Sequence, residues 1–259
     1  MTADLFDELD SVLERIRSAP AVWLGTDFDG TLVPHAANPG DVALDPQVMD
    51  LLRELGTLPR CRVAVVTGRS LADIRRLVAV HEIAYAGNHG LEIQALGLDH
   101  RDAAAVLARE PLERTALRLA DELVGRPGIT VQDKRFSLAV DYYASPMEIR
   151  RIAVAAIDAA IAGVPMLFAR HGVHGSEVRP VGAGHKGTAA LRLREHQSGP
   201  DALPIFLGDE LTDEDAFEAL PDGITIRVGD PRPTAARYCV DSPREVARFL
   251  HRLRDAIAS

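Results

Sequence analysis

The sequence predicts an α/β protein: a doubly wound parallel sheet that carries an inserted α+β domain. Towards both ends of the chain, short apolar runs alternate with helical patterns, as in a sheet covered by helices on both faces. Each apolar run stops at polar residues, and ligands bind at that edge of such sheets. The middle of the chain instead alternates in period two. We therefore expect a core of residues 1–97 and 172–259 and a cap of residues 98–171.

The expected elements follow from these patterns. The core strands are expected at 21–24, 62–66, 83–86, 203–207 and 223–228. The core helices are expected at 4–18 and 70–80, with one more that begins at residue 186 and another that ends at residue 220. The cap helices are expected at 103–124 and 146–162, and its strands within 129–143 and at 166–169. Two helices over a small antiparallel sheet form one compact α+β unit.

Composition describes an ordinary globular protein, with 47% hydrophobic and 26% charged residues. The 29 basic and 38 acidic side chains give a net charge of −9, which argues against nucleic acid as a partner. The most apolar long stretch, 152–169, is broken by an aspartate, a glycine and a proline, so no membrane span is expected. The first twenty residues do not resemble a signal peptide, and Cys61 and Cys239 fit a reducing compartment. We expect a cytoplasmic monomer or small homo-oligomer.

Two carboxylates, Asp27 and Asp29, directly follow the first expected core strand. Like charges so close repel each other, and a divalent cation would offset the repulsion. Mg²⁺ fits, because it binds one or two carboxylates together with a substrate phosphate. The alternative is a solvated Asp-Gly turn with Gly30 as the turn residue.

A second acidic segment, residues 208–215, follows the strand expected at 203–207. Acids at a helix N-terminus complement the helix dipole, and this explains Asp213 to Asp215. It does not explain Asp209, which lies at the strand end itself.

Two further segments offer contacts for a phosphate. Thr67, Gly68 and Arg69 lie at a strand-to-helix turn, where a hydroxyl and free N–H groups can hold an anion. Lys186 opens another helix and can reach a phosphate oxygen as a point charge, although a lysine at a helix start is usually a surface residue.

Together these segments resemble the haloacid dehalogenase superfamily, because the order D-x-D-G-T, T-G-R, Lys and G-D-x-x-x-D is complete. The longer strings look specifically like trehalose-6-phosphate phosphatases. These strings are DFDGTL at 27–32, GNHGLE at 87–92, EVRP at 177–180 and GDELTDEDAF at 208–217.

The resemblance implies a reaction and its residues. Asp27 would attack phosphorus and form an aspartyl-phosphate, and Asp29 would protonate the leaving sugar oxygen and then activate water. Mg²⁺ would be held by Asp27, the backbone carbonyl of Asp29 and Asp209, with Asp213 or Glu210 in support. The transferred phosphoryl group would be bound by Thr67, Gly68, Arg69 and Lys186. The substrate would be a sugar phosphate.

The expected cap departs from this family. Aligned on Lys134, the sequence has Gln132, Asp141 and Tyr143 where the family has Glu, His and Arg. Lys134, Glu177 and His89 remain as expected sugar contacts. Sites built from hydrogen bonds reject analogues strongly, so these changes can redirect specificity. Trehalose 6-phosphate or a close disaccharide phosphate is the expected substrate, with a related glycosyl or pseudo-disaccharide phosphate as the alternative.

Two other protein classes compete with the phosphatase. Residues 182–187 fit G-x-G-x-x-G with Asp209 further on, as in a nicotinamide-dependent dehydrogenase. The preceding segment ends in Arg179 and Pro180, which a buried Rossmann strand does not tolerate. A non-catalytic sugar-phosphate-binding relative would be expected to lose Asp27, Asp29 or Asp209, and the sequence keeps all three.

Overall fold

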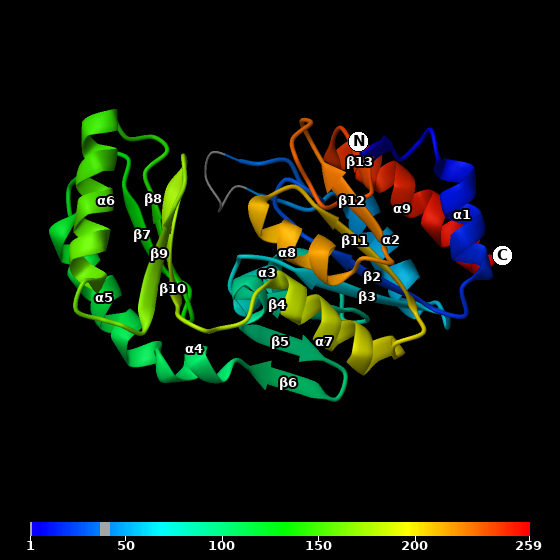
Figure 1. Ribbon diagram of the computed structural model, residues 1–259, viewed down its shortest axis with the longest axis horizontal. Coiled ribbons are helices and arrows are strands. Elements are labelled where there is room, and N and C mark those ends of the chain that lie inside the picture. Colours follow the sequence, from blue (N-terminus) through cyan, green and yellow to red (C-terminus); the bar gives the residue numbers. More distant parts are fainter. Residues whose placement is uncertain (1, 37–41) are drawn as a thin grey trace. The chain divides into compact units, whose positions relative to one another are not determined.

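The computed structural model describes residues 2–36 and 42–259, which form two compact units. We call them the core unit, Met1–His100 with Gly184–Ser259, and the cap unit, Arg101–Ala183. Figure 1 labels their helices and strands.

The core unit is built on a nine-stranded sheet with the order β1-β13-β12-β11-β2-β3-β4-β5-β6. The pairs from β1 to β4 are parallel, and β5 runs antiparallel to β4. Its strands are β1 (Ala3–Asp4), β2 (Val22–Thr26), β3 (Cys61–Val66), β4 (Ala84–Gly87), β5 (Glu92–Ala95), β6 (Leu98–Arg101), β11 (Leu203–Gly208), β12 (Ile224–Val228) and β13 (Tyr238–Val240).

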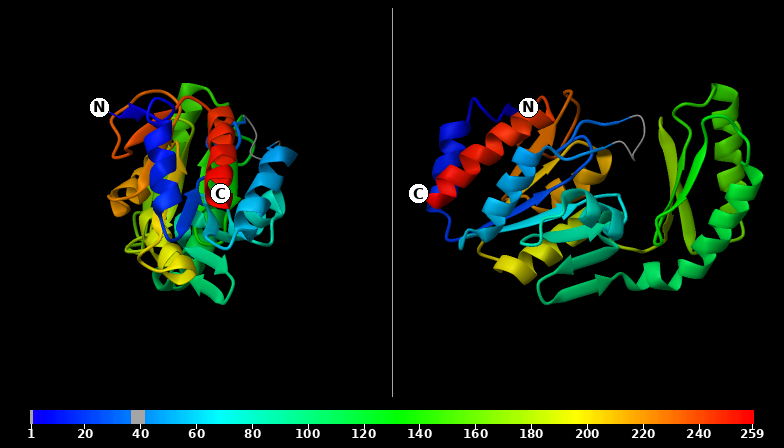
Figure 2. Two further views of the ribbon diagram at one scale, coloured as in Figure 1. Left: turned by 90° about the vertical axis from the view of Figure 1, so that its right-hand side faces the viewer. Right: turned by 180° about the vertical axis from the view of Figure 1, so that it is seen from behind.

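Helices cover both faces of this sheet. They are α1 (Leu9–Ser18), α2 (Pro46–Thr57), α3 (Leu71–Val78), α7 (Lys186–Ser198), α8 (Leu211–Ala219) and α9 (Pro243–Ala258), with a short 3₁₀ turn at Asn88–Gly90. Helix α9 lies beside α1, so the two ends of the chain are packed together (Figure 2). Within the described residues, no helix is both long and apolar enough to cross a bilayer.

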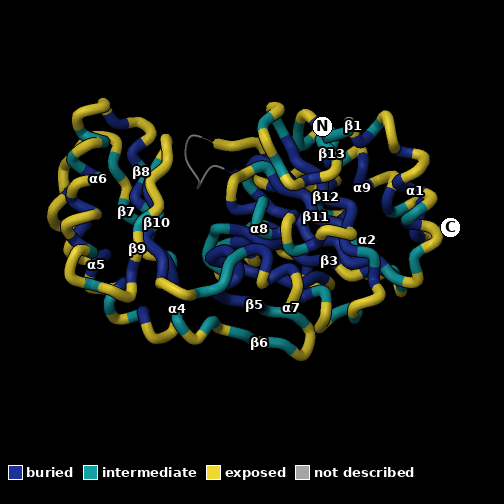
Figure 3. Tube along the Cα trace, in the orientation of Figure 1, coloured by how far each residue is buried: buried dark blue, intermediate teal, exposed yellow. Residues whose placement is uncertain are grey.

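Alternate residues of each central strand pack into two separate hydrophobic clusters, one on each face of the sheet. In β2, Val22 and Leu24 pack with α1, α2 and α9, whereas Trp23 packs with α7 and α8. The same alternation separates Ile205 and Leu207 from Phe206 in β11. A strand buried on both faces reads as a continuous apolar run, and the buried trace in Figure 3 follows these strands. The expected doubly wound core is confirmed.

The cap unit is a four-stranded antiparallel sheet with the order β7-β8-β10-β9, packed against helices. Its elements are α4 (Ala103–Leu107), α5 (Arg109–Glu122), β7 (Thr130–Asp133), β8 (Leu138–Asp141), α6 (Met147–Ile161), β9 (Leu167–His171) and β10 (Gly175–Pro180). Leu138, Val140 and Val178 enter one hydrophobic cluster with α5 and α6.

Residues between these apolar positions point to the other face of the cap sheet, because strand side chains alternate. The register places Gln132 beside Ala139, Ala139 beside Glu177, and Glu177 beside Arg170. One polar row therefore crosses the sheet on the face opposite to the helices.

Two features of the cap unit differ from the expectation. Its second boundary lies after Ala183 rather than near 171, because β10 pairs with β8 and β9 and belongs to the cap sheet. The helix expected over 103–124 is divided at Ala108. Pro111 accounts for the break, since it has no N–H for the Leu107 carbonyl and its ring clashes with that group in a continuous helix.

Candidate active site

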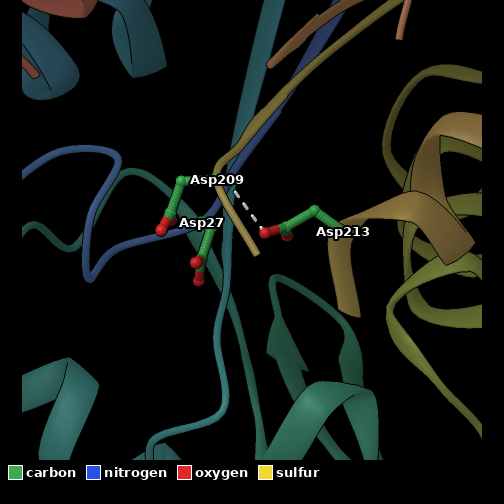
Figure 4. A group of neighbouring side chains, drawn as sticks. All are labelled: Asp27, Asp209 and Asp213. Carbon is green, nitrogen blue, oxygen red and sulfur yellow. Dashed lines mark hydrogen bonds between the residues drawn. The ribbon is translucent and has the colours of Figure 1, made fainter. Parts of the chain in front are cut away.

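Three carboxylates converge where β2 and β11 end. Asp27 follows β2, Asp209 follows β11, and Asp213 lies in the first turn of α8. Each offers one oxygen to a cluster whose atoms all lie within 4.8 Å of one another (Figure 4). Neighbouring parallel strands that end at one edge bring these distant residues together.

Lys186 enters this cluster from the start of α7. Its ammonium lies 2.7 Å from Oδ1 of Asp213 and 3.1 Å from Oδ1 of Asp27, and only 1% of its side chain is exposed. A buried ammonium is stable only when it is paired, and here it has two carboxylate partners. The lysine is therefore a buried site residue, not the surface residue that its position alone would suggest.

Negative charge exceeds positive charge in this cluster. Burial raises the pKa of Asp27 well above its ordinary range; Lys186 lowers it, and Asp213, Asp209 and Glu210 raise it. Burial likewise raises the pKa of Asp213 to about 6, against the opposing effect of Lys186. The site is thus built to receive a cation or another compensating charge.

Asp209 is fixed in place by two side chains from the segment after β2. Thr31 donates to Oδ1 at 3.0 Å, and Nε2 of His35 lies 2.9 Å from Oδ2. Gly30 allows this approach: it has a φ of +81°, and a Cβ there would lie 2.2 Å from Asp209 Oδ2. Glycine is the residue that accepts both the positive φ and the close contact.

Asp213 uses its second oxygen to hold the turn before α8. Its Oδ2 accepts hydrogen bonds from the backbone N–H groups of Asp209 and Glu210, at 3.1 and 2.9 Å. A carboxylate that caps a helix start in this way fixes its own position. Glu210, also expected near the metal, is exposed and lies outside the carboxylate cluster.

The donor set suits Mg²⁺, which prefers oxygen ligands and binds few carboxylates. Asp27, Asp209 and Asp213 supply only oxygen atoms, and burial, with a smaller effect of the neighbouring carboxylates, raises the pKa values of Asp27 and Asp213. The side chain of Asp29 lies outside this group, which leaves its backbone carbonyl as the atom expected to take part.

Asp29 is bound by Arg69. The guanidinium donates from Nε to Oδ2 and from Nη2 to Oδ1 of Asp29, both at 2.6 Å, and from Nη1 to Asp73 at 3.1 Å. Arg69, which the sequence predicts near the phosphate, thus binds the side chain of the expected acid. Asp73 is half-buried, and the hydrogen bonds from Arg76 and Arg69 outweigh that burial and lower its pKa.

Thr67 and Gly68 lie in the turn after β3, in the core unit. Thr67 is buried, and its hydroxyl accepts the Arg69 N–H at 3.3 Å. A Cβ on Gly68 would lie 2.6 Å from the ring of His89, so the glycine lets this ring pack against the turn. His89 is itself buried in the core unit, beside the expected phosphate-binding residues.

Sequence reasoning gave no role to three residues that shape the site: His35, Asn88 and Glu92. Buried Glu92 accepts from Asn88 at 2.8 Å and from the Leu71 N–H at 3.2 Å, which ties the 3₁₀ turn to the start of α3. Asn88 and His89 have φ values of 50° and 57°, a conformation that few residues other than glycine adopt. The string GNHGLE contains two of these residues, but the letters alone do not reveal the positive φ. No pattern pointed to His35.

The expected sugar contacts of the cap are placed by its sheet. Glu177 lies in β10 on the polar face, together with Gln132, and Asp141 is on the same face because it lies two residues beyond Ala139. Lys134 follows β7, and its N–H bonds the Ser137 carbonyl at 3.0 Å. Tyr143 is half-exposed, with its ring 4.4 Å from that of His174.

A parallel sheet with Asp27 and Asp29 beyond one strand, Asp209 beyond its neighbour and Lys186 beside Asp27 matches the haloacid dehalogenase-like fold. Solved structures have the same fold. The C-terminal domain of the C. albicans trehalose-6-phosphate phosphatase matches with a TM-score of 0.83 at 20% identity, over 98% of each chain. A trehalose-6-phosphate phosphatase related protein matches with a TM-score of 0.79 at 24% identity, over 90% of this chain and 97% of that one.

The chain belongs to the trehalose-phosphatase family, whose sequence model matches residues 25–243. It is 39% identical over 247 residues to the trehalose-phosphate phosphatase of Mycobacterium tuberculosis, covering 90% of this chain and 61% of the relative. An uncharacterized glycosyl hydrolase of the same species is 39% identical over 251 residues, which are 90% of this chain and 18% of that protein. The chain thus spans about three fifths of the curated phosphatases that it matches.

Proposed function

We propose that this chain hydrolyses trehalose 6-phosphate, or a close disaccharide phosphate, to the free sugar and inorganic phosphate. The observation that carries the proposal is Asp27, a buried carboxylate at a strand end that is held by Lys186 beside Asp209 and Asp213. The family and its phosphatase relatives support this activity.

In the first step, an oxygen of Asp27 attacks phosphorus and the bond from phosphorus to the sugar oxygen breaks. Asp29 gives its proton to that oxygen, so the sugar leaves as an alcohol and not as an alkoxide. Lys186 places a positive charge next to Asp27, where the transferred phosphoryl group accumulates negative charge. Thr67 and Gly68 supply further donors from the neighbouring turn.

In the second step, Asp29 is the base. It takes a proton from a water molecule, whose oxygen attacks the phosphorus of the aspartyl-phosphate and releases inorganic phosphate and the Asp27 carboxylate. Arg69 holds the Asp29 carboxyl in place for this step, because it donates a hydrogen bond to each of its two oxygens. The proton taken from water restores the acid form of Asp29 for the next cycle.

Mg²⁺ is the proposed cofactor. Asp27, Asp209, the carbonyl of Asp29 and Asp213 would hold it, and it would neutralise charge on the phosphoryl oxygens. Thr31 and His35 keep Asp209 in position for this role.

The polar row of the cap sheet favours a second candidate within the same reaction class. Gln132 and Asp141 share the face that carries Glu177, so two of the three departures from the family lie beside an expected sugar contact. A related glycosyl or pseudo-disaccharide phosphate is therefore the alternative substrate.

The test is phosphate release from a panel of sugar phosphates with Mg²⁺, using wild type and Asp27→Asn. Wild type should prefer trehalose 6-phosphate or a relative. The variant should release none, because an amide cannot attack phosphorus. Mass spectrometry after trapping with beryllofluoride should locate the adduct on Asp27. Release by Asp27→Asn at the wild-type rate would exclude the covalent mechanism.

A further inference from the structure

A second basic cluster lies in the core unit, around the end of β12. An open pocket of about 380 Å³ is lined there by Arg227, Gly229 and Arg232, and on one side by Gly30, His35 and Asp209. This volume falls in the range of small-molecule sites. The proposed reaction uses neither arginine.

Arg227 is buried but incompletely paired. Only 4% of it is exposed, its Nη1 donates to the Gly229 carbonyl at 3.1 Å, and its Nε has no hydrogen-bond partner among the described residues. A buried guanidinium without partners is costly, and most buried donors in proteins are satisfied. Arg227 lines the pocket, so a ligand bound there would lie next to this incompletely paired guanidinium.

Arg232 adds a second guanidinium at the same place. It donates to the backbone carbonyl of Asp209, and its Nε also lacks a partner within the described part of the chain. The two like charges repel each other: burial and the neighbouring Arg232 lower the pKa of Arg227. Two arginines that approach each other around a cavity are arranged as for an anion bound between them.

The surrounding acids do not neutralise these arginines by direct contact. No carboxylate of the described residues lies within 4.0 Å of either guanidinium, although 38 acids face 29 bases in the chain. Glu214, the nearest candidate on α8, instead accepts from the Thr234 hydroxyl at 3.0 Å and the Ala235 N–H at 2.8 Å. Asp230 and Asp241 also line the pocket and are exposed to solvent, so their charges are screened by water.

We propose that this pocket is a second binding site for a phosphate group, either as inorganic phosphate or as the phosphoryl group of a small ester, held between Arg227 and Arg232. The forked donors of arginine match two oxygens of a tetrahedral anion. A Cβ on Gly229 would meet no atom within 4 Å, so the backbone there leaves the space open. The site does not depend on the reaction at Asp27.

Binding at this site would be felt at the carboxylate cluster. Arg232 holds the backbone carbonyl of Asp209, and His35, on the pocket wall, holds its carboxylate. Phosphate released by the enzyme, or a phosphate ester in solution, would thus bind directly next to a residue expected to hold the metal.

The test is calorimetric titration of the full chain with inorganic phosphate in the presence of EDTA. Without a metal, the three carboxylates of the Asp27 site outnumber its one lysine, and the excess negative charge repels phosphate. The arginine pocket should therefore account for the binding of one phosphate per chain. Arg227→Gln and Arg232→Gln should weaken binding at least tenfold. The matched control Arg192→Gln removes an exposed arginine from α7 and should bind like wild type.

Further arms separate the remaining explanations. Lys186→Met should leave phosphate binding unchanged, and a loss would assign the bound phosphate to the Asp27 site and overturn the proposal. Arg232 is only partly buried, so its substitution should disturb the fold less than that of Arg227. If circular dichroism shows that Arg227→Gln does not fold, Arg232→Gln provides the test. Displacement of phosphate by glucose 6-phosphate would identify an ester as a ligand, and no displacement would restrict the site to inorganic phosphate. The proposal would be overturned if wild type bound no phosphate, or if Arg232→Gln bound phosphate as tightly as wild type.

Discussion

Arg69 binds both carboxylate oxygens of Asp29, each at 2.6 Å, and so holds the residue that the proposed reaction needs as both acid and base. A guanidinium fork of this kind fixes the orientation of the carboxyl as well as binding it. Asp29 is therefore held in one orientation for the proton transfers of both proposed steps.

The first prediction concerns this pair. Asp29→Asn should lower hydrolysis of the sugar phosphate by at least about a hundredfold, the usual contribution of a general acid or base. Formation of the phosphoenzyme from 4-nitrophenyl phosphate should suffer much less, because nitrophenolate leaves without a proton. Rapid-quench measurement of the burst separates the two steps, and an equal loss in phosphoenzyme formation from both substrates would contradict the acid role of Asp29.

Arg69→Gln should also slow turnover of the sugar phosphate, by about ten- to a hundredfold, since one charge-assisted hydrogen bond is worth about 1.5 to 3 kcal/mol. Arg76→Gln is the matched control, because Arg76 donates to Asp73 at 2.7 Å and has no bond to Asp29. Steady-state rates of the two variants should differ clearly. Equal rates would show that the Arg69–Asp29 pair has no part in catalysis.

The next prediction follows from the charge imbalance around Asp27. The pKa of this buried carboxyl is raised in the folded protein, so the native state favours its protonated form. Its stabilising contribution is present below about pH 4 and is lost as pH rises through the raised native pKa. At pH 7.5 and without metal, Asp27→Asn should therefore be more stable than wild type, with a melting temperature higher by about 2 to 4 °C for each kcal/mol gained.

Thermal melts in EDTA at pH 5 and pH 7.5 measure this effect. Wild type should lose more stability than Asp27→Asn between the two pH values, because only wild type ionises the buried carboxyl. Mg²⁺ should stabilise wild type more than the variant, since the variant has lost one negative ligand. Parallel pH dependence of wild type and variant would disprove the charge imbalance.

Metal dependence gives a further prediction. EDTA should abolish turnover and Mg²⁺ should restore it, and Asp209→Asn should raise the Mg²⁺ concentration for half-maximal activity at least tenfold. Glu210→Gln should change it little, because Glu210 lies outside the carboxylate cluster. Activity titrations with Mg²⁺ decide between these neighbours. If Glu210→Gln raises the Mg²⁺ requirement as much as Asp209→Asn does, Glu210 also holds the metal.

The core could be predicted from the sequence because its strands are buried on both faces. Continuous apolar runs such as 203–207 have no solvent-facing positions, and they stop where the chain reaches the site. Asp27 and Asp209 could be found for the same reason, since a motif at the end of a buried strand has a defined place in the sheet. Lys186 lies at the start of a helix, and only its order among the other motifs indicated its role.

The strands of the cap are harder to predict from the sequence than those of the core, for a physical reason. Strand β10 reads as polar although it is buried or half-buried along its length, so nothing in residues 175–180 distinguishes a cap strand from a core segment. Only its pairing with β8 and β9 places it in the cap, and pairing between distant segments is not encoded in local pattern. The pairing of Arg69 with Asp29 is likewise not visible in any local pattern, because 40 residues separate the two along the chain.

The last prediction concerns the cap, which carries two of the three expected sugar contacts, whereas the proposed reaction of the core acts on the phosphoryl group. Lys134→Ala and Glu177→Ala should each lower kcat/KM on the true sugar phosphate tenfold or more, about 1.4 kcal/mol in transition-state stabilisation. A small aryl phosphate lacks the sugar hydroxyls and should lose much less. Glu148→Ala, an exposed change on α6 that lies away from the polar face, is the control for general damage to the cap.

The three departures from the family allow the substrate itself to be tested in the same assay. If the substrate is trehalose 6-phosphate, the triple change of Gln132 to Glu, Asp141 to His and Tyr143 to Arg should be neutral or improve turnover. If it is a related glycosyl phosphate, the triple variant should lose that substrate and gain trehalose 6-phosphate, because hydrogen-bonding sites discriminate strongly between analogues. Gln132 and Asp141 share the polar face with Glu177, so their changes should act on the same part of the sugar. Equal losses on sugar and aryl phosphates from Lys134→Ala and Glu177→Ala would instead show that these residues support the fold of the cap and do not contact the sugar.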